Sequence, residues 1–78
     1  MLEFEIDIRS FQQVQDFVAL ACDHPFDIRV GNERQHINGK DLMGMFSLDF
    51  SRPLQVRVLA EQEEFTAFRQ KALALLAE

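Results

Sequence analysis

Four short stretches of the chain alternate apolar and polar residues, the period expected of a strand with one buried and one solvated face. We predict strands over residues 2–8, 26–30, 34–37 and 54–59. The stretch 34–37 has the weakest pattern. The residues before it, Gly31-Asn32-Glu33, have turn composition, so the second and third strands should form a hairpin.

Apolar residues at helical spacing fill the stretches between and after these strands. They predict helices over residues 11–22, 41–48 and 62–77. Ser10 and Gln13 have capping-box spacing at the start of the first helix, and Asp41 is placed to cap the second. The order βαββαβα, with one polar face on most strands, predicts a single α+β domain over residues 1–78, in which helices cover one face of one sheet.

The predicted second helix is apolar around most of its circumference. Its apolar residues are Leu42, Met43, Met45, Phe46 and Leu48. A helix of two turns cannot bury every side against one sheet, so Leu42, Met43 and Phe46, with Ser47 beside them, are candidate contacts for a protein partner. Complete burial of the apolar set in the core is the alternative interpretation.

The composition limits the kinds of partner and the cellular compartment that we expect for this chain. The net charge is −5 and the eight basic residues are scattered, which argues against nucleic acid as a partner. The single cysteine, Cys22, excludes an intrachain disulfide and fits a reducing compartment. No apolar run approaches the roughly 20 residues that span a membrane, and the N-terminus lacks a basic signal start, so we expect a cytoplasmic protein without membrane attachment.

The residues that could carry chemistry form no recognisable site. Neither His24 nor His36 has other ligand residues at metal-binding spacing, so we expect no metal and no cofactor. Cys22 closes the apolar stripe of the first helix and should be a buried small hydrophobe. The acidic pairs Glu3/Glu5 and Glu63/Glu64 fit a solvated strand face and a helix start. The glycines match no phosphate-binding motif.

The segment Lys40-Asp41-Leu42-Met43-Gly44-Met45-Phe46-Ser47-Leu48 resembles the regulatory segment Lys-Ser-Ile-Met-Gly-hydrophobic-Met-Ser-Leu of the HPr family, the phosphocarrier proteins of the bacterial sugar phosphotransferase system. Phe17-Val18 also falls on a Phe-Val pair typical of the family's first helix. The resemblance covers nearly the whole chain. It implies an HPr-like βαββαβα open-faced sandwich, with a four-stranded antiparallel sheet and three helices on one face.

Two departures from the family pattern bear on function. Ser10 and Gln12 stand where the family has its phosphoryl-accepting histidine and its arginine, and a serine hydroxyl needs an activating base to act as a nucleophile. Asp41 occupies the position of the regulatory serine and already carries a negative charge there. The resemblance therefore implies a non-enzymatic regulatory module, degenerate at the phosphorylation site, which is a monomer or weak dimer. Its partner would be a phosphotransferase-system enzyme or a transcription regulator.

Two other functions stay open at this point. The chain could be a phosphocarrier that uses a non-standard acceptor, or an orphan structural α+β domain that shares only the topology. An apolar surface on the second helix favours the binding module, whereas a phosphate adduct on the protein would favour the carrier.

Overall fold

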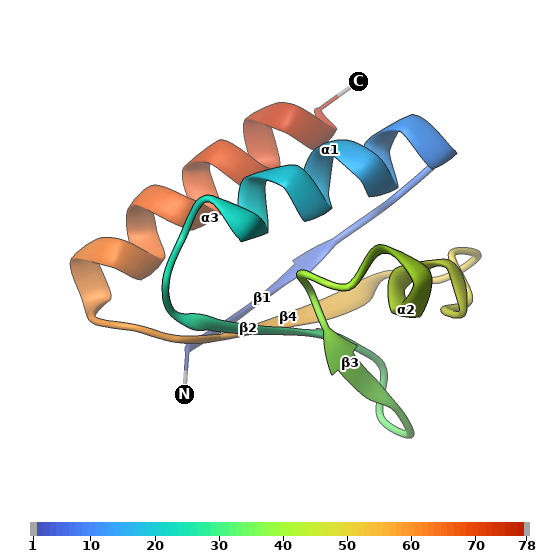
Figure 1. Ribbon diagram of the computed structural model, residues 1–78, viewed down its shortest axis with the longest axis horizontal. Coiled ribbons are helices and arrows are strands. Elements are labelled where there is room, and N and C mark those ends of the chain that lie inside the picture. Colours follow the sequence, from blue (N-terminus) through green and yellow to red (C-terminus); the bar gives the residue numbers. More distant parts are fainter. Residues whose placement is uncertain (1, 78) are drawn as a thin grey trace.

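The computed structural model describes residues 2–77 and contains the predicted βαββαβα order (Figure 1). The elements are β1 (Leu2–Ile6), α1 (Phe11–Cys22), β2 (Asp27–Gly31), β3 (His36–Asn38), α2 (Leu42–Phe46), β4 (Leu54–Leu59) and α3 (Gln62–Leu76). None of the helices within residues 2–77 has the length and apolar character needed to span a bilayer.

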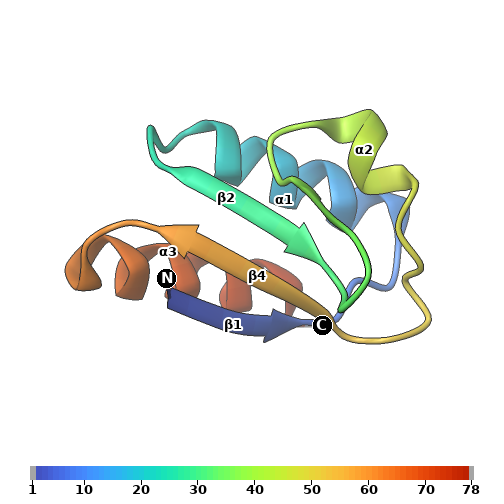
Figure 2. The same cartoon turned by 90° about the horizontal axis from the view of Figure 1, so that it is seen from below.

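The four strands form one antiparallel sheet in the order β1-β4-β2-β3. β4 is central and pairs with β1 from Leu2↔Val58 to Ile6↔Leu54. Helices α1 and α3 lie side by side over one face, and α2 packs against α1 and β3 (Figures 1 and 2). The opposite face carries no helix formed by residues 2–77 (Figure 1). The fold is thus the predicted α+β open-faced sandwich.

The core lies between the sheet and the pair α1 and α3. Its largest fully buried side chains include Phe17 of α1, Phe68 of α3 and Ile28 of β2. Phe68 is the centre of an aromatic cluster, with ring centroids 6.0 Å from Phe17 and 6.1 Å from Phe4. These contacts join both helices to the edge strand β1 without any cross-link.

Several element ends differ from the sequence prediction because they depend on partners. β1 ends at Ile6, where its partner β4 begins at Leu54, although Ile8 is still buried as predicted. β3 begins at His36, because the Asn32 side chain accepts hydrogen bonds from the N–H groups of residues 34 and 35 and holds them in the turn. α2 ends at Phe46, where i→i−3 hydrogen bonds tighten the chain over residues 47 and 48.

The helix caps follow the predicted positions but not all of the predicted bonds. Ser10 Oγ accepts from the N–H of Gln13 at 3.2 Å, as expected. Gln13 Oε1 instead accepts from the N–H of Arg9 at 2.7 Å, one residue earlier than a capping box requires. Asp41 is the N-cap residue of α2, yet its carboxylate makes no capping hydrogen bond. The side chain of Glu64 accepts from the N–H of Glu61 at 3.2 Å, a contact that we did not predict.

Candidate docking surface

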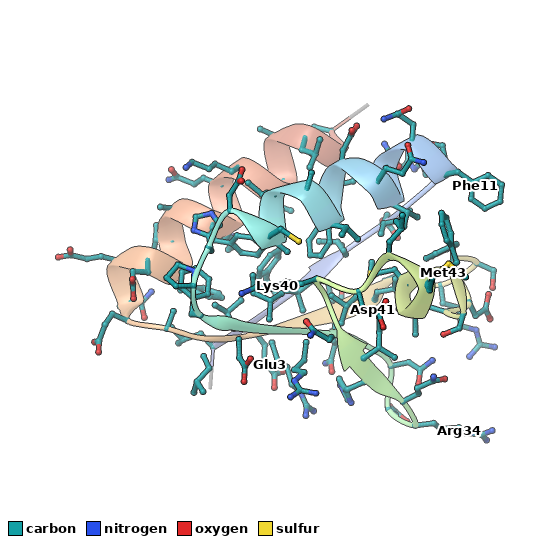
Figure 3. The ribbon with its side chains drawn as sticks, viewed as in Figure 1. Glu3, Phe11, Arg34, Lys40, Asp41 and Met43 are labelled. Atoms are coloured by element: carbon teal, nitrogen blue, oxygen red, sulfur yellow. The ribbon has the colours of Figure 1, made fainter. Side chains whose placement is uncertain are left out.

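Three large apolar side chains are exposed together where α1 begins and α2 lies beside it. Met43 is 77% exposed, Phe11 is 72% exposed and Phe46 is 37% exposed. The rings of Phe11 and Phe46 meet edge to face, with centroids 5.5 Å apart at 78°. Figure 3 shows Phe11 and Met43 projecting on the same side of the molecule. We call Phe11, Met43 and Phe46 the α1–α2 patch.

The other apolar residues of this segment anchor the patch. Met45 is fully buried, Leu48 is 6% exposed and Leu42 packs against the core from a partly buried position. The predicted set of apolar residues therefore divides into a buried side and an exposed side. Complete burial of the set, the alternative interpretation, is wrong, because a helix of five residues has only one side against the sheet.

Phe11 and Cys22 both belong to the apolar stripe of α1 but are exposed, and the exposure of Cys22 corrects the sequence prediction that it is buried. Phe11 is the first residue of the helix and projects past the ends of the strands (Figure 3), so its ring packs on Phe46 instead of entering the core. Cys22 is the last residue and is exposed, with its Sγ 3.7 Å from the carbonyl oxygen of Lys40. A helical period alone cannot show where the covering sheet stops.

Ser10 and Gln12 are both engaged in local hydrogen bonds. Ser10 caps α1 through its Oγ, and Gln12 Nε2 donates to Asp16 Oδ1 at 2.9 Å. Within residues 2–77 neither imidazole lies at the start of α1 beside Ser10, since His24 follows the far end of α1 and His36 begins β3. The His24 ring stacks on Phe26 with centroids 5.0 Å apart, which makes it part of the aromatic cluster.

Asp41 places a negative charge beside α2, whereas the Lys40 side chain points towards the end of α1 (Figure 3). Lys40 Nζ donates to the carbonyl oxygen of His24 at 2.6 Å, which ties the end of α1 to the segment before α2. Asp41 is exposed, and its carboxylate lies over the first turn of α2, where a Cβ added to Gly44 would be 3.0 Å from Asp41 Oδ2. Negative charge at a helix N-terminus is favourable even without a direct cap.

Neither a metal site nor a catalytic cluster accompanies this surface. Within residues 2–77 no three His, Cys, Asp or Glu residues are grouped to hold a metal ion. The proposed Ser47 contact is exposed, and its hydroxyl donates back to the carbonyl oxygen of Gly44 at 2.6 Å. What this region can do chemically is to bury apolar side chains against another surface.

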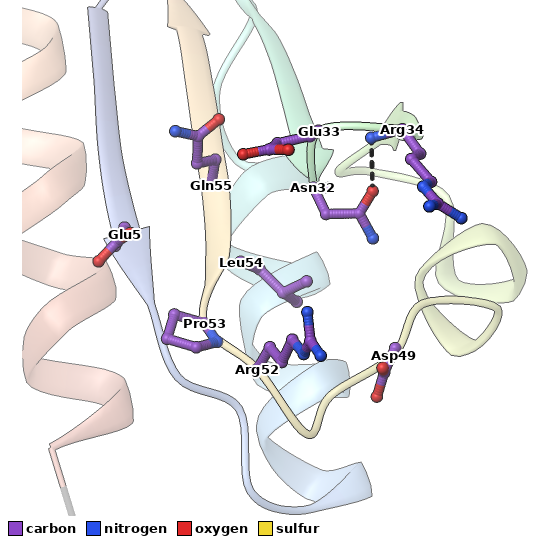
Figure 4. Close-up of a pocket in the computed structure, with 10 residues that line it drawn as sticks. Glu5, Asn32, Glu33, Arg34, Asp49, Arg52, Pro53, Leu54 and Gln55 are labelled. Carbon is purple, nitrogen blue, oxygen red and sulfur yellow. Dashed lines mark hydrogen bonds between the residues drawn. The ribbon is translucent and has the colours of Figure 1, made fainter.

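A broad open cavity of about 670 Å³ lies where β2 ends and β4 begins (Figure 4). Its charged lining residues are Glu5, Glu33, Arg34, Asp49 and Arg52. The charges of both signs largely offset one another. Hydrogen bonds from the side chain and the N–H of Ser51 lower the pKa of the Asp49 carboxyl. None of the predicted site residues lines this cavity.

No protein-family model and no curated protein sequence matches this chain. Among solved structures, HPr-C-His from Thermoanaerobacter tengcongensis is 22% identical with a TM-score of 0.77, and the match covers 100% of this chain and 98% of that one. A phosphocarrier protein HPr from Bacillus anthracis is 15% identical with a TM-score of 0.73, covering 96% and 95%.

A third similar structure is Crh, the catabolite repression protein of Bacillus subtilis, described as an intertwined dimer with a swapped domain. It is 23% identical with a TM-score of 0.59, and the match covers 99% of this chain and 90% of that one. All three likenesses extend over nearly the full length of both partners. The chain therefore has the HPr-like fold.

Proposed function

We propose that this chain is a non-catalytic, HPr-like regulatory module that binds a protein partner of the sugar phosphotransferase system through α2 and the start of α1. The observation that carries the proposal is the exposed α1–α2 patch on an HPr-like fold. Large aromatic and methionine side chains grouped in the open are typical of a protein contact. The proposal places the protein in the bacterial cytoplasm, with an enzyme or a transcription regulator of that system as its partner.

The state of Ser10 and Gln12 supports binding without phosphoryl transfer. Ser10 Oγ accepts the N–H of Gln13, and among the described residues no hydrogen bond joins it to a base that could remove its proton. Gln12 has no positive charge to stabilise a transferring phosphoryl group. His24 is partly buried between the rings of Phe26 and Phe68, with ring centroids 5.0 and 5.2 Å away, and its Nε2 is buried, so a phosphoryl donor could reach that nitrogen only by displacing these rings.

Each member of the surface has a distinct part in the proposed contact. Met43 and Phe46 would enter the partner's apolar surface, and Phe11 would extend that contact onto α1. Leu42 would keep α2 in position by packing against the core, and Ser47 would lie at the edge of the contact with the partner. Full burial of one large apolar side chain contributes at most about 1.5–3 kcal/mol to the free energy of binding. Two or three such residues therefore suffice for a specific contact.

Asp41 would place a fixed negative charge beside the contact. In this proposal it acts as a partial substitute for a phosphoserine, with one carboxylate in place of a more highly charged phosphate. A partner that recognises it should present Lys or Arg near the residue that covers Met43. Replacement by serine would remove the charge and retain a side chain able to cap α2.

Intact-mass measurement separates the binding module from the carrier. The protein would be incubated with phosphoenolpyruvate and the first enzyme of the system, and separately with ATP and the HPr kinase. We expect no phosphate adduct in either reaction. An adduct in the first reaction would restore the alternative of a phosphocarrier with a non-standard acceptor, and peptide mapping would then locate that acceptor.

Calorimetric titration against the purified first enzyme and a purified catabolite regulator tests the docking surface. Met43→Asp should weaken a measured interaction at least about tenfold, because a charge would be desolvated at the centre of the contact. Leu59→Asp is the matched control, since Leu59 is 58% exposed but lies at the end of β4. Equal losses of affinity in the two variants would contradict the proposal. It would also be contradicted if the parent chain bound neither of the two proteins.

A further inference from the structure

The edge strand β1 offers a binding feature separate from the α1–α2 patch. Within residues 2–77, β1 pairs with β4 alone, so the backbone groups along its other side have no strand partner. Such an edge is a template for an added strand unless the protein blocks it. β1 contains neither proline nor glycine, so its whole length from Leu2 to Ile6 can accept an extended segment.

Helix α3 forms a wall along β1. The Phe4 ring meets Phe65 at 5.7 Å and Phe68 at 6.1 Å, both edge to face. Further along both elements, a cavity of about 300 Å³ opens between the end of β1 and the last turns of α3. Its apolar lining includes Ile6, Leu73 and Leu76, of which Leu73 is 38% exposed, and the charged residues Glu5, Asp7 and Arg9 also border it. The edge therefore has a socket with an apolar side and a charged rim at the Ile6 end.

Acidic side chains project from the opposite face of the same strand. Glu3 and Glu5 are exposed and alternate with the apolar residues of β1. Glu3 is neutralised in part by Arg57, whose Nε is 3.1 Å away. Glu5 lies opposite Gln55, and within the described residues it has no ion pair. Asp7 continues this acidic row just beyond the strand and also borders the cavity.

This charge pattern opposes pairing of β1 with a second copy of itself. An antiparallel pair centred on Phe4 places Glu3 opposite Glu5 of the other copy. Centring the pair on Glu3 or on Glu5 places that central glutamate opposite its own equivalent. Like charges directly opposite each other destabilise a strand pair. The same row would attract a strand that carries lysine or arginine at every second position.

We propose that β1 is a docking edge for an extended basic segment of another protein. The segment adds to the sheet antiparallel to β1, sets Lys or Arg side chains opposite Glu5 and Glu3, and inserts an apolar side chain into the socket lined by Ile6, Leu73 and Leu76. This inference does not rest on the proposed function, because the two surfaces share no residue.

Two synthetic peptides test the proposal on the isotopically labelled full chain by NMR. The basic peptide, Leu-Lys-Val-Lys-Val-Lys, places its leucine at the Ile6 end when it pairs antiparallel. The acidic peptide, Leu-Glu-Val-Glu-Val-Glu, has the same apolar residues. We expect the basic peptide to bind at least about fivefold more tightly, with amide shift changes in residues 2–6 and 73–76. Equal affinities, or shifts confined to the α1–α2 patch, would overturn the proposal.

A charge reversal on the strand provides the second readout. Glu5→Lys should reverse the preference, so that the acidic peptide binds more tightly than the basic one. Glu33→Lys is the matched control: it changes the net charge equally from the exposed turn between β2 and β3, and should leave the preference as it is. A preference reversed by both variants, or dimers formed through β1 in sedimentation experiments, would also overturn the proposal.

Discussion

Ser10 and Phe11 are neighbours at the start of α1, yet their side chains have different roles. Ser10 satisfies a backbone N–H of the first helical turn, whereas Phe11 is 72% exposed and packs on Phe46 of another helix. The cap was predictable, because it depends on residues within one turn. The exposure of Phe11 was not, because it depends on where the sheet beneath α1 ends. Local sequence therefore located the helix start but missed one of the three patch residues.

The Asp49 carboxyl provides a test of the loop before β4 at single-residue level. Ser51 donates to Asp49 Oδ1 from its Oγ at 2.6 Å and from its N–H at 2.9 Å, and these bonds lower the pKa of Asp49 below 3.8. Ser51→Ala removes the side-chain bond, so the pKa should rise towards 3.8. Carboxyl carbon shifts followed through a pH titration measure the change. Ser47→Ala is the control and should leave the pKa of Asp49 unchanged.

The sign of the pH effect follows from the direction of that pKa. A carboxyl with a lower pKa in the folded state than in the unfolded state stabilises the fold above its unfolded pKa. This contribution is lost as the pH falls through the folded pKa. Ser51→Ala should therefore be less stable than the parent chain above the unfolded pKa of Asp49, and the difference should shrink as the pH falls through the folded pKa of the parent. Denaturant titrations between neutral pH and the acid range would show this, and a difference independent of pH would contradict it.

Gly31 and Gly44 should respond in opposite ways to alanine. A Cβ at Gly31 would be only 1.8 Å from the backbone carbonyl oxygen of Gln35, which cannot move without opening the hairpin. Gly31→Ala should lower the free energy of unfolding by about 1–3 kcal/mol. At Gly44 the nearest atom is the Asp41 side-chain oxygen at 3.0 Å, which can rotate away, and alanine favours a helix by up to about 1 kcal/mol. Denaturant unfolding compares the two; a larger loss at Gly44 would contradict this account.

At the scale of elements, Lys40 joins α1 to the start of α2. Its Nζ donates to the carbonyl oxygen of His24, and its own N–H donates to Asn38 Oδ1 at 3.0 Å. Lys40→Met keeps most of the apolar stem but removes the charged donor. We expect a loss of about 1 kcal/mol in unfolding free energy and faster amide exchange in residues 22–26, because the loop after α1 loses its tie. Lys71→Met, on the exposed side of α3, is the control.

The contrast between well and poorly predicted element ends has a physical basis. Both ends of α1 matched the prediction, since Ser10 starts the helix and the residues before Pro25 stop it. The end of β1 and the start of β3 did not match, because they depend on where β4 begins and on the Asn32 turn. The exposed half of α2 was predicted from its excess of apolar residues. Its N-cap position was also correct, although Asp41 makes no capping bond.

At the scale of the whole molecule, one substitution made at two phenylalanines separates folding from docking. Phe68 is fully buried and its ring contacts those of Phe4, Phe17 and Phe26, so Phe68→Ala should cost about 3–5 kcal/mol. That is a large share of the roughly 5–15 kcal/mol that stabilises a typical domain. Phe11→Ala removes an equal volume from the surface and should cost about 1 kcal/mol or less.

The same two variants assign the α1–α2 patch its role. Phe11→Ala should melt far closer to the parent chain than Phe68→Ala does and bind the partner more weakly, since it loses contact area but no core. Thermal unfolding by circular dichroism measures the first property and calorimetric titration the second. If Phe11→Ala melted at as low a temperature as Phe68→Ala, the patch would stabilise the fold as core residues do, despite its exposure to water. If it bound the partner as tightly as the parent chain, docking would be restricted to α2, and α1 would contribute only the scaffold that positions Met43 and Phe46.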